Sequence, residues 1–303
     1  MAISRAQLVK ELEPGLNALF GLEYKRYDNQ SSEIYVSENS DRAFEEEVML
    51  SGFGNAQVKG EGQGVSFDDA QETFTARYTH ETIALAFAIT EEAIEDNLYD
   101  RISSRYTKAL ARSMANAKQV KAVEPLINGL PTTDAFDSGD GVSLFNTSHT
   151  TLNGSLQNTL STQADLNETS LEQALIDISG MTDERGLKVA AKGVKMIVPP
   201  ENQFNAERLM KSQGRVGTAD NDINAINSLG MIPQGYRVNN YLTDTDAWYI
   251  ITDVPNGMKH FVRAALKTAM EGDFDTGNVR FKARERYSFG VSDPRGIFGV
   301  EGA

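Results

Sequence analysis

The chain has 303 residues, of which 40% are hydrophobic and 24% are charged, and its formal net charge is −14. This composition excludes a disordered or fibrous protein, and the acidity excludes a general nucleic-acid binder. The sequence has no cysteine, which excludes disulfides, thiolate nucleophiles and Cys-type zinc sites. An acidic chain still suits a container for nucleic acid, because a wall of like charge does not adhere to the packed polymer, although acidity also simply confers solubility.

No segment predicts a membrane helix or a secretion signal. The longest apolar run, residues 83–89, is far shorter than the roughly 20 residues that span a bilayer. The first seven residues lack the apolar core of a signal peptide. We therefore expect the chain to be made, and to stay, in a cytoplasm until something releases it.

The first 45 residues are typical of an arm that lies across other structure. Pro14 and Gly15 separate two short segments with helical spacing, and residues 34–36 predict a short strand. The apolar residues of the two helical segments are Leu8 and Leu12, then Leu16, Leu19 and Phe20. They are too few for the arm to fold alone.

Residues 46–82 predict a long hairpin with a glycine-rich tip. Residues 73–79 alternate between apolar and polar, which predicts a strand on the far side of the tip. The glycines are Gly52, Gly54, Gly60, Gly62 and Gly64. No Gly-Lys-Ser/Thr follows them, so a hairpin tip is favoured over a phosphate-binding loop. An isolated hairpin is marginal in water, so this one needs a neighbour.

A strand and a long helix follow. Both faces of residues 83–89 are apolar, which predicts a buried strand. Thr90, with Glu91 and Glu92 after it, predicts a helix N-terminus. A spine helix of about 25 residues, about 37 Å long, is predicted from about Asp100, ending before Pro125 or at Asn128-Gly129. Its predicted inward stripe is Ile102, Tyr106, Ala109, Leu110, Ser113, Ala117 and Val120.

The central part predicts a mixed α+β region after the turn-rich residues 131–165. Thr169 and Glu172 predict a capping box, followed by the stripe Leu171, Leu175, Ile178 and Met181. Further helices are predicted at 201–211, with Phe204 and either Leu209 or Met210 inward, and at 222–229. Strands are predicted at 194–198, 236–241, 247–252 and 258–264.

The last predicted strand, 278–291, has one basic face and one apolar face that Glu285 interrupts. The basic face consists of Arg280, Lys282, Arg284 and Arg286. Four like charges on one strand face repel unless something negative covers them, and residues 33–81 hold eleven acidic residues against three basic ones. The complementary charges indicate either ion pairs within one domain or a contact between copies whose register the charges set.

No motif predicts catalysis, a cofactor or a metal. His80 and Glu81 match the first two positions of the zinc-protease motif H-E-x-x-H, but residue 84 is alanine in place of the second histidine. His149 lies in a predicted polar turn, and His260 lies in a predicted strand beside Phe261, so both are expected to serve the fold. The set Asp134, Asp137 and Asp140 lacks the bidentate glutamate of a calcium loop, and no G-x-S-x-G is present. A triad assembled only in space remains an alternative.

The order of arm, glycine-rich hairpin, strand and spine helix resembles the HK-97-type fold of tailed-phage major capsid proteins. The junction at 88–96 is similar to the family's strand-to-spine junction, and residues 284–291 resemble its closing strand. The segment 144–151 with Asn153-Gly154, followed by residues 169–172, is similar to the major head subunit family of Mu-like phages. The likeness covers nearly the whole chain.

This resemblance implies an α+β protein with an N-arm (1–45), an E-loop (46–82), a peripheral domain (83–130 and 276–303) and an axial domain (131–275). It implies a virion shell of hexamers and pentamers around DNA, assembled in the host cytoplasm with a portal and a possible decoration protein. Since the arm starts almost at Met1, we expect a separate scaffolding protein. Lys59 is the one E-loop candidate for the Lys–Asn crosslink that certain relatives form, although no partner is matched.

The candidate contacts between copies combine the acidic hairpin with the basic strand. They are Glu45, Glu46, Glu47, Lys59, Gly60, Gly62, Gly64, Asp68 and Asp69 on one side, and Arg280, Lys282, Arg284 and Arg286 on the other. Two alternatives stay open, an encapsulin-like nanocompartment that encloses cargo enzymes and a cytosolic α+β enzyme. Cargo that co-purifies would favour the first, and a small oligomer with a concave site of convergent titratable groups would favour the second.

Overall fold

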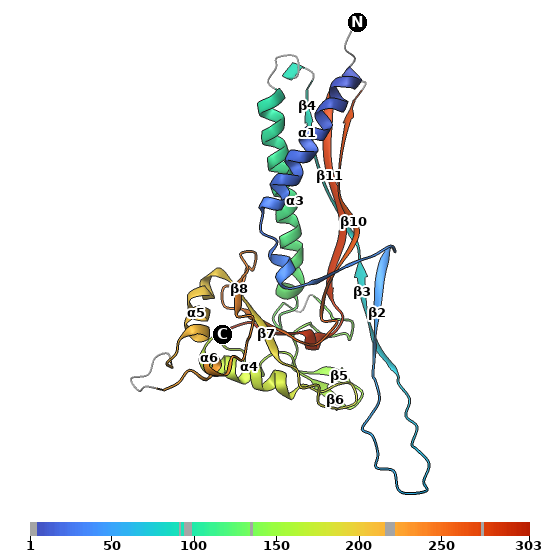
Figure 1. The fold of residues 1–303 in the computed structure, drawn as a ribbon, viewed down its shortest axis with the longest axis vertical. Helices are drawn as coiled ribbons and strands as arrows, with labels where there is room; N and C mark the ends of the chain where they lie inside the picture. The colour runs from blue at the N-terminus through green and yellow to red at the C-terminus, as the bar shows by residue number, and fades with distance from the viewer. Residues whose placement is uncertain (1–4, 91, 94–98, 134–135, 216–221, 274–275) are drawn as a thin grey trace.

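The computed structural model describes residues 5–90, 92–93, 99–133, 136–215, 222–273 and 276–303, with side chains placed from residue 14 onward except at 99–102. These residues form an elongated molecule. Two helices and a long sheet make one end, a compact mixed body lies in the middle, and a hairpin projects beyond it (Figure 1). Within the described parts, no helix is both long and apolar enough to cross a membrane.

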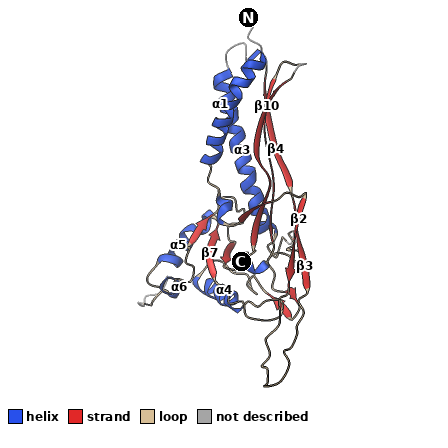
Figure 2. Cartoon of the chain, turned by 45° about the vertical axis from the view of Figure 1, so that its right-hand side comes forward, coloured by secondary structure: helices blue, strands red, loops and turns tan. Residues whose placement is uncertain are grey.

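The long sheet has four strands in the order β1-β10-β11-β4. The strands are β1 (Val36–Asn39), β10 (Met258–Gly272), β11 (Val279–Val291) and β4 (Glu81–Ile89). β1 runs parallel to β10, and the other neighbours are antiparallel. The helices α1 (Arg5–Arg26) and α3 (Tyr99–Asn128) lie alongside the sheet (Figure 2). The core between them is formed by Leu16, Phe20, Leu110, Met114 and Phe281.

The arm helix α1 is continuous, so the two separate segments expected around Pro14 are wrong. A proline inside a helix removes one backbone hydrogen bond and costs about 3 kcal/mol. Here Leu16 and Phe20 are buried against the spine, and this packing offsets that cost. The expectation that the arm lies across other structure is confirmed, while the side chains of Leu8 and Leu12 lie outside the described set. The expected strand at 34–36 begins instead at Val36, after a 3₁₀ turn at Gln30–Glu33.

The spine helix passes through Pro125 and ends at Asn128, which confirms the later of the two expected ends. Its inward stripe was wrong by about one residue. Tyr106 and Val120 are 53% and 41% exposed, and Ile102 lies outside the described side chains. Apart from Leu110, the buried positions are shifted toward Thr107, Ala111, Met114, Ala115, Gln119, Ala122 and Val123. Gln119 can lie on this buried face because its side-chain oxygen accepts a bond from the Ser31 amide at 2.9 Å.

The strand predicted at 83–89 is present as β4, but it is an edge strand and not a buried one. Ala84, Leu85, Ala86 and Ala88 are exposed in the single chain, Leu85 by 47%. The predicted N-cap at Thr90 has its hydrogen bond, from the Ala93 amide at 3.4 Å, while Glu91 lies outside the described residues. The apolar pattern of residues 83–89 therefore predicted the strand correctly, but not that it is exposed in the single chain.

The compact body is built on a second four-stranded sheet in the order β12-β9-β7-β8. Its strands are β7 (Gly193–Val198), β8 (Tyr236–Val238), β9 (Trp248–Thr252) and β12 (Ile297–Val300). The helices are α4 (Glu168–Gly180), α5 (Gln203–Lys211) and α6 (Ala225–Leu229), and a small hairpin joins β5 (His149–Thr151) to β6 (Gly154–Leu156). The α4 stripe predicted from the sequence is buried as expected.

Two local expectations in the compact body are wrong. Helix α4 begins at Glu168 because Asn167 and Ser170 form the capping box, with bonds of 2.9 and 3.0 Å, in place of Thr169 and Glu172. Phe204 is 70% exposed, since α5 turns Ala206 and Leu209 toward the core.

The two sheets exchange strands near the C-terminus. Residues 258–272, expected in the segment 131–275, pair with β11 in the long sheet. Residues 297–300, expected in 276–303, pair with β9 in the compact sheet. The two crossing segments touch at Gly257 and Gly296, where a Cβ on Gly257 would lie 2.7 Å from the other glycine's Cα.

Candidate assembly interfaces

The hairpin predicted at 46–82 is formed by β2 (Phe44–Leu50) and β3 (Glu72–Thr79). The two strands are antiparallel, and Phe44 pairs with Thr79 and Val48 with Thr75. Residues 51–71 continue beyond the strands as an extended loop (Figure 1). We call the paired strands the root and residues 51–71 the tip.

The root is fixed to its own chain by Tyr78. This side chain is 3% exposed, packs edge-on against Phe261 with ring centroids 4.8 Å apart, and shares a hydrogen bond with Ser292. The ring lies over Gly290, where a Cβ would be only 2.5 Å from it. A glycine at 290 is therefore required for the root to lie against β11.

Polar groups complete the root. The buried Lys259 ammonium pairs with Glu47 and, at 3.3 Å, with Glu38. His80 is 5% exposed at the turn from β3 into β4, with the hydroxyls of Ser40 and Ser288 each 2.9 Å from a ring nitrogen. Burial, with the nearby Arg286, lowers the pKa of His80, so the neutral ring fits the root.

The tip has no comparable packing. A single turn, from the Gln63 amide to the Gly60 carbonyl at 3.2 Å, closes its end. Four apolar side chains on it are 62–100% exposed: Phe53, Val58, Val65 and Phe67. Sequence reasoning missed them because Phe53 and Val58 follow no period and the alternation at Val65 and Phe67 spans only residues 65–68. A folded chain rarely exposes so many large apolar groups on one loop without a binding partner.

The predicted acidic contact residues lie along the hairpin and have modest partners within the chain. Ser40 donates to Glu45 at 2.7 Å, and Glu46 lies 3.8 Å from Arg77. The Gly54 amide donates to Asp68 at 2.7 Å and lowers the pKa of that exposed carboxyl. Arg185 reaches Asp68 at 3.8 Å and the Asp69 carbonyl. The remaining predicted residues, Lys59, Gly60, Gly62 and Gly64, are exposed at the tip.

The predicted basic residues share one face of β11, as expected. Arg280, Lys282 and Arg284 are exposed and Arg286 is half-buried, whereas Phe281, Ala283, Glu285 and Tyr287 are buried between them. We call the four basic residues the basic strip. Across the ladder they pair with the small residues Ala88, Ala86, Ala84 and Thr82 of β4. Asp273 pairs with Arg280, and Glu271 of β10 lies opposite Arg280 in the ladder, so the positive charge of the strip is concentrated at Lys282, Arg284 and Arg286.

The exception on the apolar face, Glu285, is a buried carboxylate that sequence reasoning left without a role. It is 3% exposed, lies 3.6 Å from the Lys118 ammonium, and accepts from the Tyr24 hydroxyl at 3.4 Å. Burial raises the pKa of Glu285. Because Tyr24 lies on α1 and Lys118 on α3, this carboxylate joins both helices to β11. A single acidic residue inside an apolar face was the available signal.

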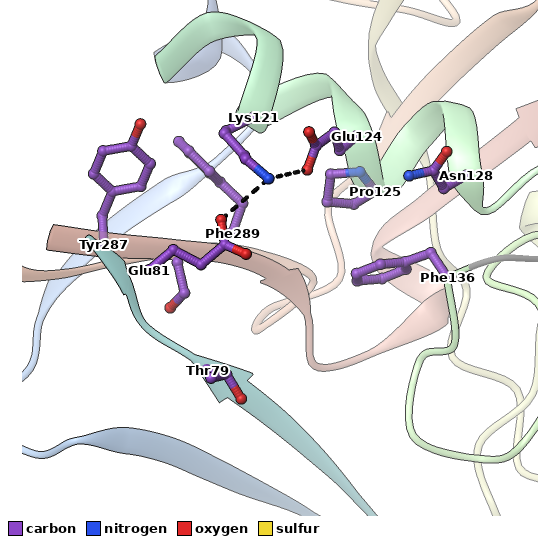
Figure 3. A pocket seen from close by; sticks show the side chains of 10 residues that line it. Thr79, Glu81, Lys121, Glu124, Pro125, Asn128, Phe136, Tyr287 and Phe289 are labelled. Carbon is purple, nitrogen blue, oxygen red and sulfur yellow. Dashed lines mark hydrogen bonds and ion pairs between the residues drawn. The ribbon is translucent and has the colours of Figure 1, made fainter. Parts of the chain in front are cut away.

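A cavity of about 170 Å³ lies between the C-terminal half of α3, β11 and the start of β4 (Figure 3). Lys121 reaches into it and is paired with Glu124 at 2.9 Å and Glu81 at 3.1 Å. These bonds raise the pKa of Lys121, so the amine is charged and engaged. A nucleophilic or basic lysine needs the opposite shift, and this arrangement is a structural one.

The other histidines serve the fold. His149 is buried with Asp140 at 2.6 Å and Asn158 at 3.0 Å, which orders the turn-rich region. His260 stacks on Phe289 at 4.4 Å, and burial lowers its pKa to about 3. Asp137 accepts bonds from the Gly139 and Gly141 amides, and Asp134 lies outside the described residues. Among the residues that the structure describes, no cluster of three metal-ligating side chains exists.

Residues 72–300 match the family model of the phage capsid protein, which is more than two thirds of the chain. The chain belongs to the phage capsid protein family. The family and the fold are those of structural capsid proteins and not of enzymes, so the predicted absence of catalysis follows from membership. No curated protein matches the sequence closely enough to count as a relative.

Solved capsids share the fold of this capsid protein. The capsid of an empty GTA particle matches with a TM-score of 0.55 and 15% identity, over 90% of this chain and 89% of that one. The capsid of the cyanophage P-SCSP1u matches with a TM-score of 0.55 and 11% identity, over 89% and 86%. A virus-like particle from Pyrococcus furiosus matches with a TM-score of 0.51 and 12% identity, over 94% and 98%.

These findings confirm the predicted fold and the prediction of a tailed-phage major capsid protein. They place the protein in the virion and do not favour the nanocompartment or the cytosolic enzyme. The closer likeness to head subunits of Mu-like phages stays a prediction, as do the contact residues and the domain boundaries.

Proposed function

We propose that copies of this capsid protein assemble as hexamers and pentamers into a closed icosahedral shell that encloses double-stranded DNA. One observation carries the proposal. The chain presents an acidic hairpin with an apolar tip and, on a different part of the molecule, a basic strip. The hairpin points away from the outer part of the long sheet (Figure 1), so a second copy must bring the two together.

In the shell, the hairpin of one copy lies over the long sheet of its neighbour. The acidic groups for this contact are Glu45, Glu46, Asp68 and Asp69. Glu47 takes part only if it replaces its bond with Lys259 by one to the neighbouring copy. The basic strip receives them. Each surface ion pair contributes only about 0–1 kcal/mol, but the same modest contact repeated over a closed shell gives high avidity.

The domain names follow from this arrangement. Residues 1–45 form the N-arm and 46–82 the E-loop. The peripheral domain combines α3 with the long sheet and includes residues 258–272. The axial domain is the compact body with residues 297–300, and its copies meet around the five-fold and six-fold axes.

Further partners complete the proposal. A separate scaffolding protein guides assembly in the host cytoplasm, a portal occupies one vertex, and a decoration protein binds outside. The net charge of −14 suits a wall that encloses DNA without binding it specifically. The crosslink at Lys59 is not part of the proposal, since no described Asn and Glu are matched to it.

Electron microscopy of charge-reversed subunits tests the docking. Lys282→Glu with Arg284→Glu reverses half of the basic strip, and we expect closed shells to be lost while circular dichroism and the unfolding midpoint stay unchanged. Lys188→Glu with Lys192→Glu changes the net charge equally on exposed residues of the compact body, and this control should still form shells. Normal shells from the first variant would contradict charge docking. A uniform particle of a few copies from the unmodified protein under every condition would contradict the shell.

A further inference from the structure

Among the residues that the structure describes, none pairs with the outer edge of β4, the strand that ends the long sheet. Residues 83–89 of β4 are apolar on both faces, which is the pattern of a strand with neighbours on both sides. A long, exposed, apolar edge strand is a template for pairing with another chain.

We propose that residues 64–71 of a second copy's hairpin pair along this edge and add one more strand to the long sheet. The inference rests on the proposed shell and names the backbone contact within it. Residues 64–71 suit the role because they are extended and exposed and belong to no strand in their own chain. Their backbone is held to the opposite arm of the loop only at its base, where Ser51 and Gln71 exchange hydrogen bonds.

The two faces of this segment match the two faces of β4. Val65 and Phe67 alternate with Ser66 and Asp68, so an extended strand has an apolar face and an acidic face. On β4, the face toward α3 carries Ile83, Leu85 and Phe87, with the exposed Tyr106 ring 5.8 Å from Phe87. The opposite face carries the small residues that border the basic strip. One orientation therefore buries Val65 and Phe67 beside Leu85 and places Asp68 on the basic side.

The small residues of β4 explain how the charges reach each other. A strand added to β4 lies two strand spacings, or about 10 Å, from β11. Arginine and lysine side chains of the basic strip can extend over Ala84, Ala86 and Ala88 toward Asp68, because an alanine methyl does not block them. The other arm of the loop, residues 52–59, holds no acidic residue, which is why the segment 64–71 is the one that fits.

The contacts that the segment gives up lie at the surface: the bond from the Gly54 amide to Asp68, the bond from Arg185 to the Asp69 carbonyl, and one ion pair. Asp68 and Arg185 are 46% and 23% exposed and 3.8 Å apart, a surface pair that contributes at most about 1 kcal/mol. Phe67 is 94% exposed and Val65 is 65% exposed, so docking buries apolar area that nothing in its own chain covers.

Hydrogen exchange of unassembled subunits and purified shells tests the pairing. We expect alternate amides of residues 81–89 and of residues 64–71 to exchange at least about 10-fold more slowly in shells than in unassembled subunits. Shells in which residues 81–89 exchange as fast as in free subunits would overturn the inference and leave the shell function intact. Failure to form any closed particle would overturn the proposed function and this inference with it.

Engineered disulfides fix the orientation, since the chain has no cysteine of its own. Ser66→Cys combined in turn with Ala84→Cys, Ala86→Cys and Ala88→Cys should give chain-to-chain disulfides in oxidised shells for at least one pair. Ser66→Cys with Leu85→Cys is the matched control, because Leu85 lies on the opposite face, and it should stay reduced. Equal crosslinking of both sets, or none in either, would mean that the hairpin does not pair with this edge in the stated orientation.

Discussion

The root and the tip of the hairpin belong to one segment, residues 44–79, yet they place their aromatic residues differently. At the root, Tyr78 is buried against Phe261 and Gly290 of its own chain. At the tip, Phe67 is 94% exposed and Phe53 is 62% exposed. The root is therefore part of the subunit's core, whereas the tip carries apolar surface that its own chain leaves exposed. The same residue type serves folding in one half of the hairpin and, in the proposed shell, assembly in the other.

The largest difference between the two regions should appear on removing an aromatic ring. Tyr78→Ala should lower the free energy of unfolding by about 3–5 kcal/mol, because it leaves a cavity between β3, Phe261 and Gly290. Urea unfolding of the unassembled subunit measures this. A loss below about 1 kcal/mol would mean that the root is not held by Tyr78, and that the comparison between root and tip fails.

Acid should loosen the root by a smaller amount. The folded root lowers the pKa of His80 through burial and the charge of Arg286, whereas the unfolded chain binds that proton below about pH 6.5. The unfolded state then holds more protons, so this part of the stability is complete above pH 6.5 and is lost as the pH falls.

The variant His80→Gln isolates this effect. Between about pH 7.5 and about pH 5.5, the unfolding midpoint of the unmodified subunit should fall further than that of the variant. Equal pH dependence in both proteins would show that the His80 proton is not coupled to the root.

The smallest effect on the subunit should come from the tip. Phe67→Ala removes an exposed ring and should change the free energy of unfolding by less than about 0.5 kcal/mol. It should still reduce the yield of closed shells, as counted by electron microscopy, because the proposed docking buries this ring between copies. A subunit destabilised as much as by Tyr78→Ala would place Phe67 in the core of the chain, and an unchanged shell yield would leave its exposure without a role in assembly.

The sequence could predict most elements because their signals are local. The spine helix, the hairpin, the α4 stripe and the basic face of β11 follow from periodicity over short stretches. Burial was harder, because it depends on distant partners. Residues 83–89 have the pattern of a buried strand, yet β4 is exposed in one chain, and Tyr106 and Phe204 were expected inside but face outward.

Other features depend on specific pairings that no period reveals. Glu285 is buried because Tyr24 and Lys118 meet it, and Asn167 displaces Thr169 as the cap through one exchange of hydrogen bonds with Ser170. The exchange of β10 and β12 between the sheets requires the three-dimensional topology. The predicted acidic and basic contact residues lie where expected along the hairpin and β11, and their pairing between chains rests on the experiments above.

The two crossing segments between the sheets give the subunit a defined mechanical character. The chain passes from β9 to β10 and returns from β11 to β12, and the two passages touch at Gly257 and Gly296. Beside them, the buried Arg295 is bound to Asp293 at 2.9 Å. At this point the long sheet is joined to the compact body by two chain segments that lie side by side. Because the two passages pack against each other, the joint between the long sheet and the compact body resists bending more than a single linker would.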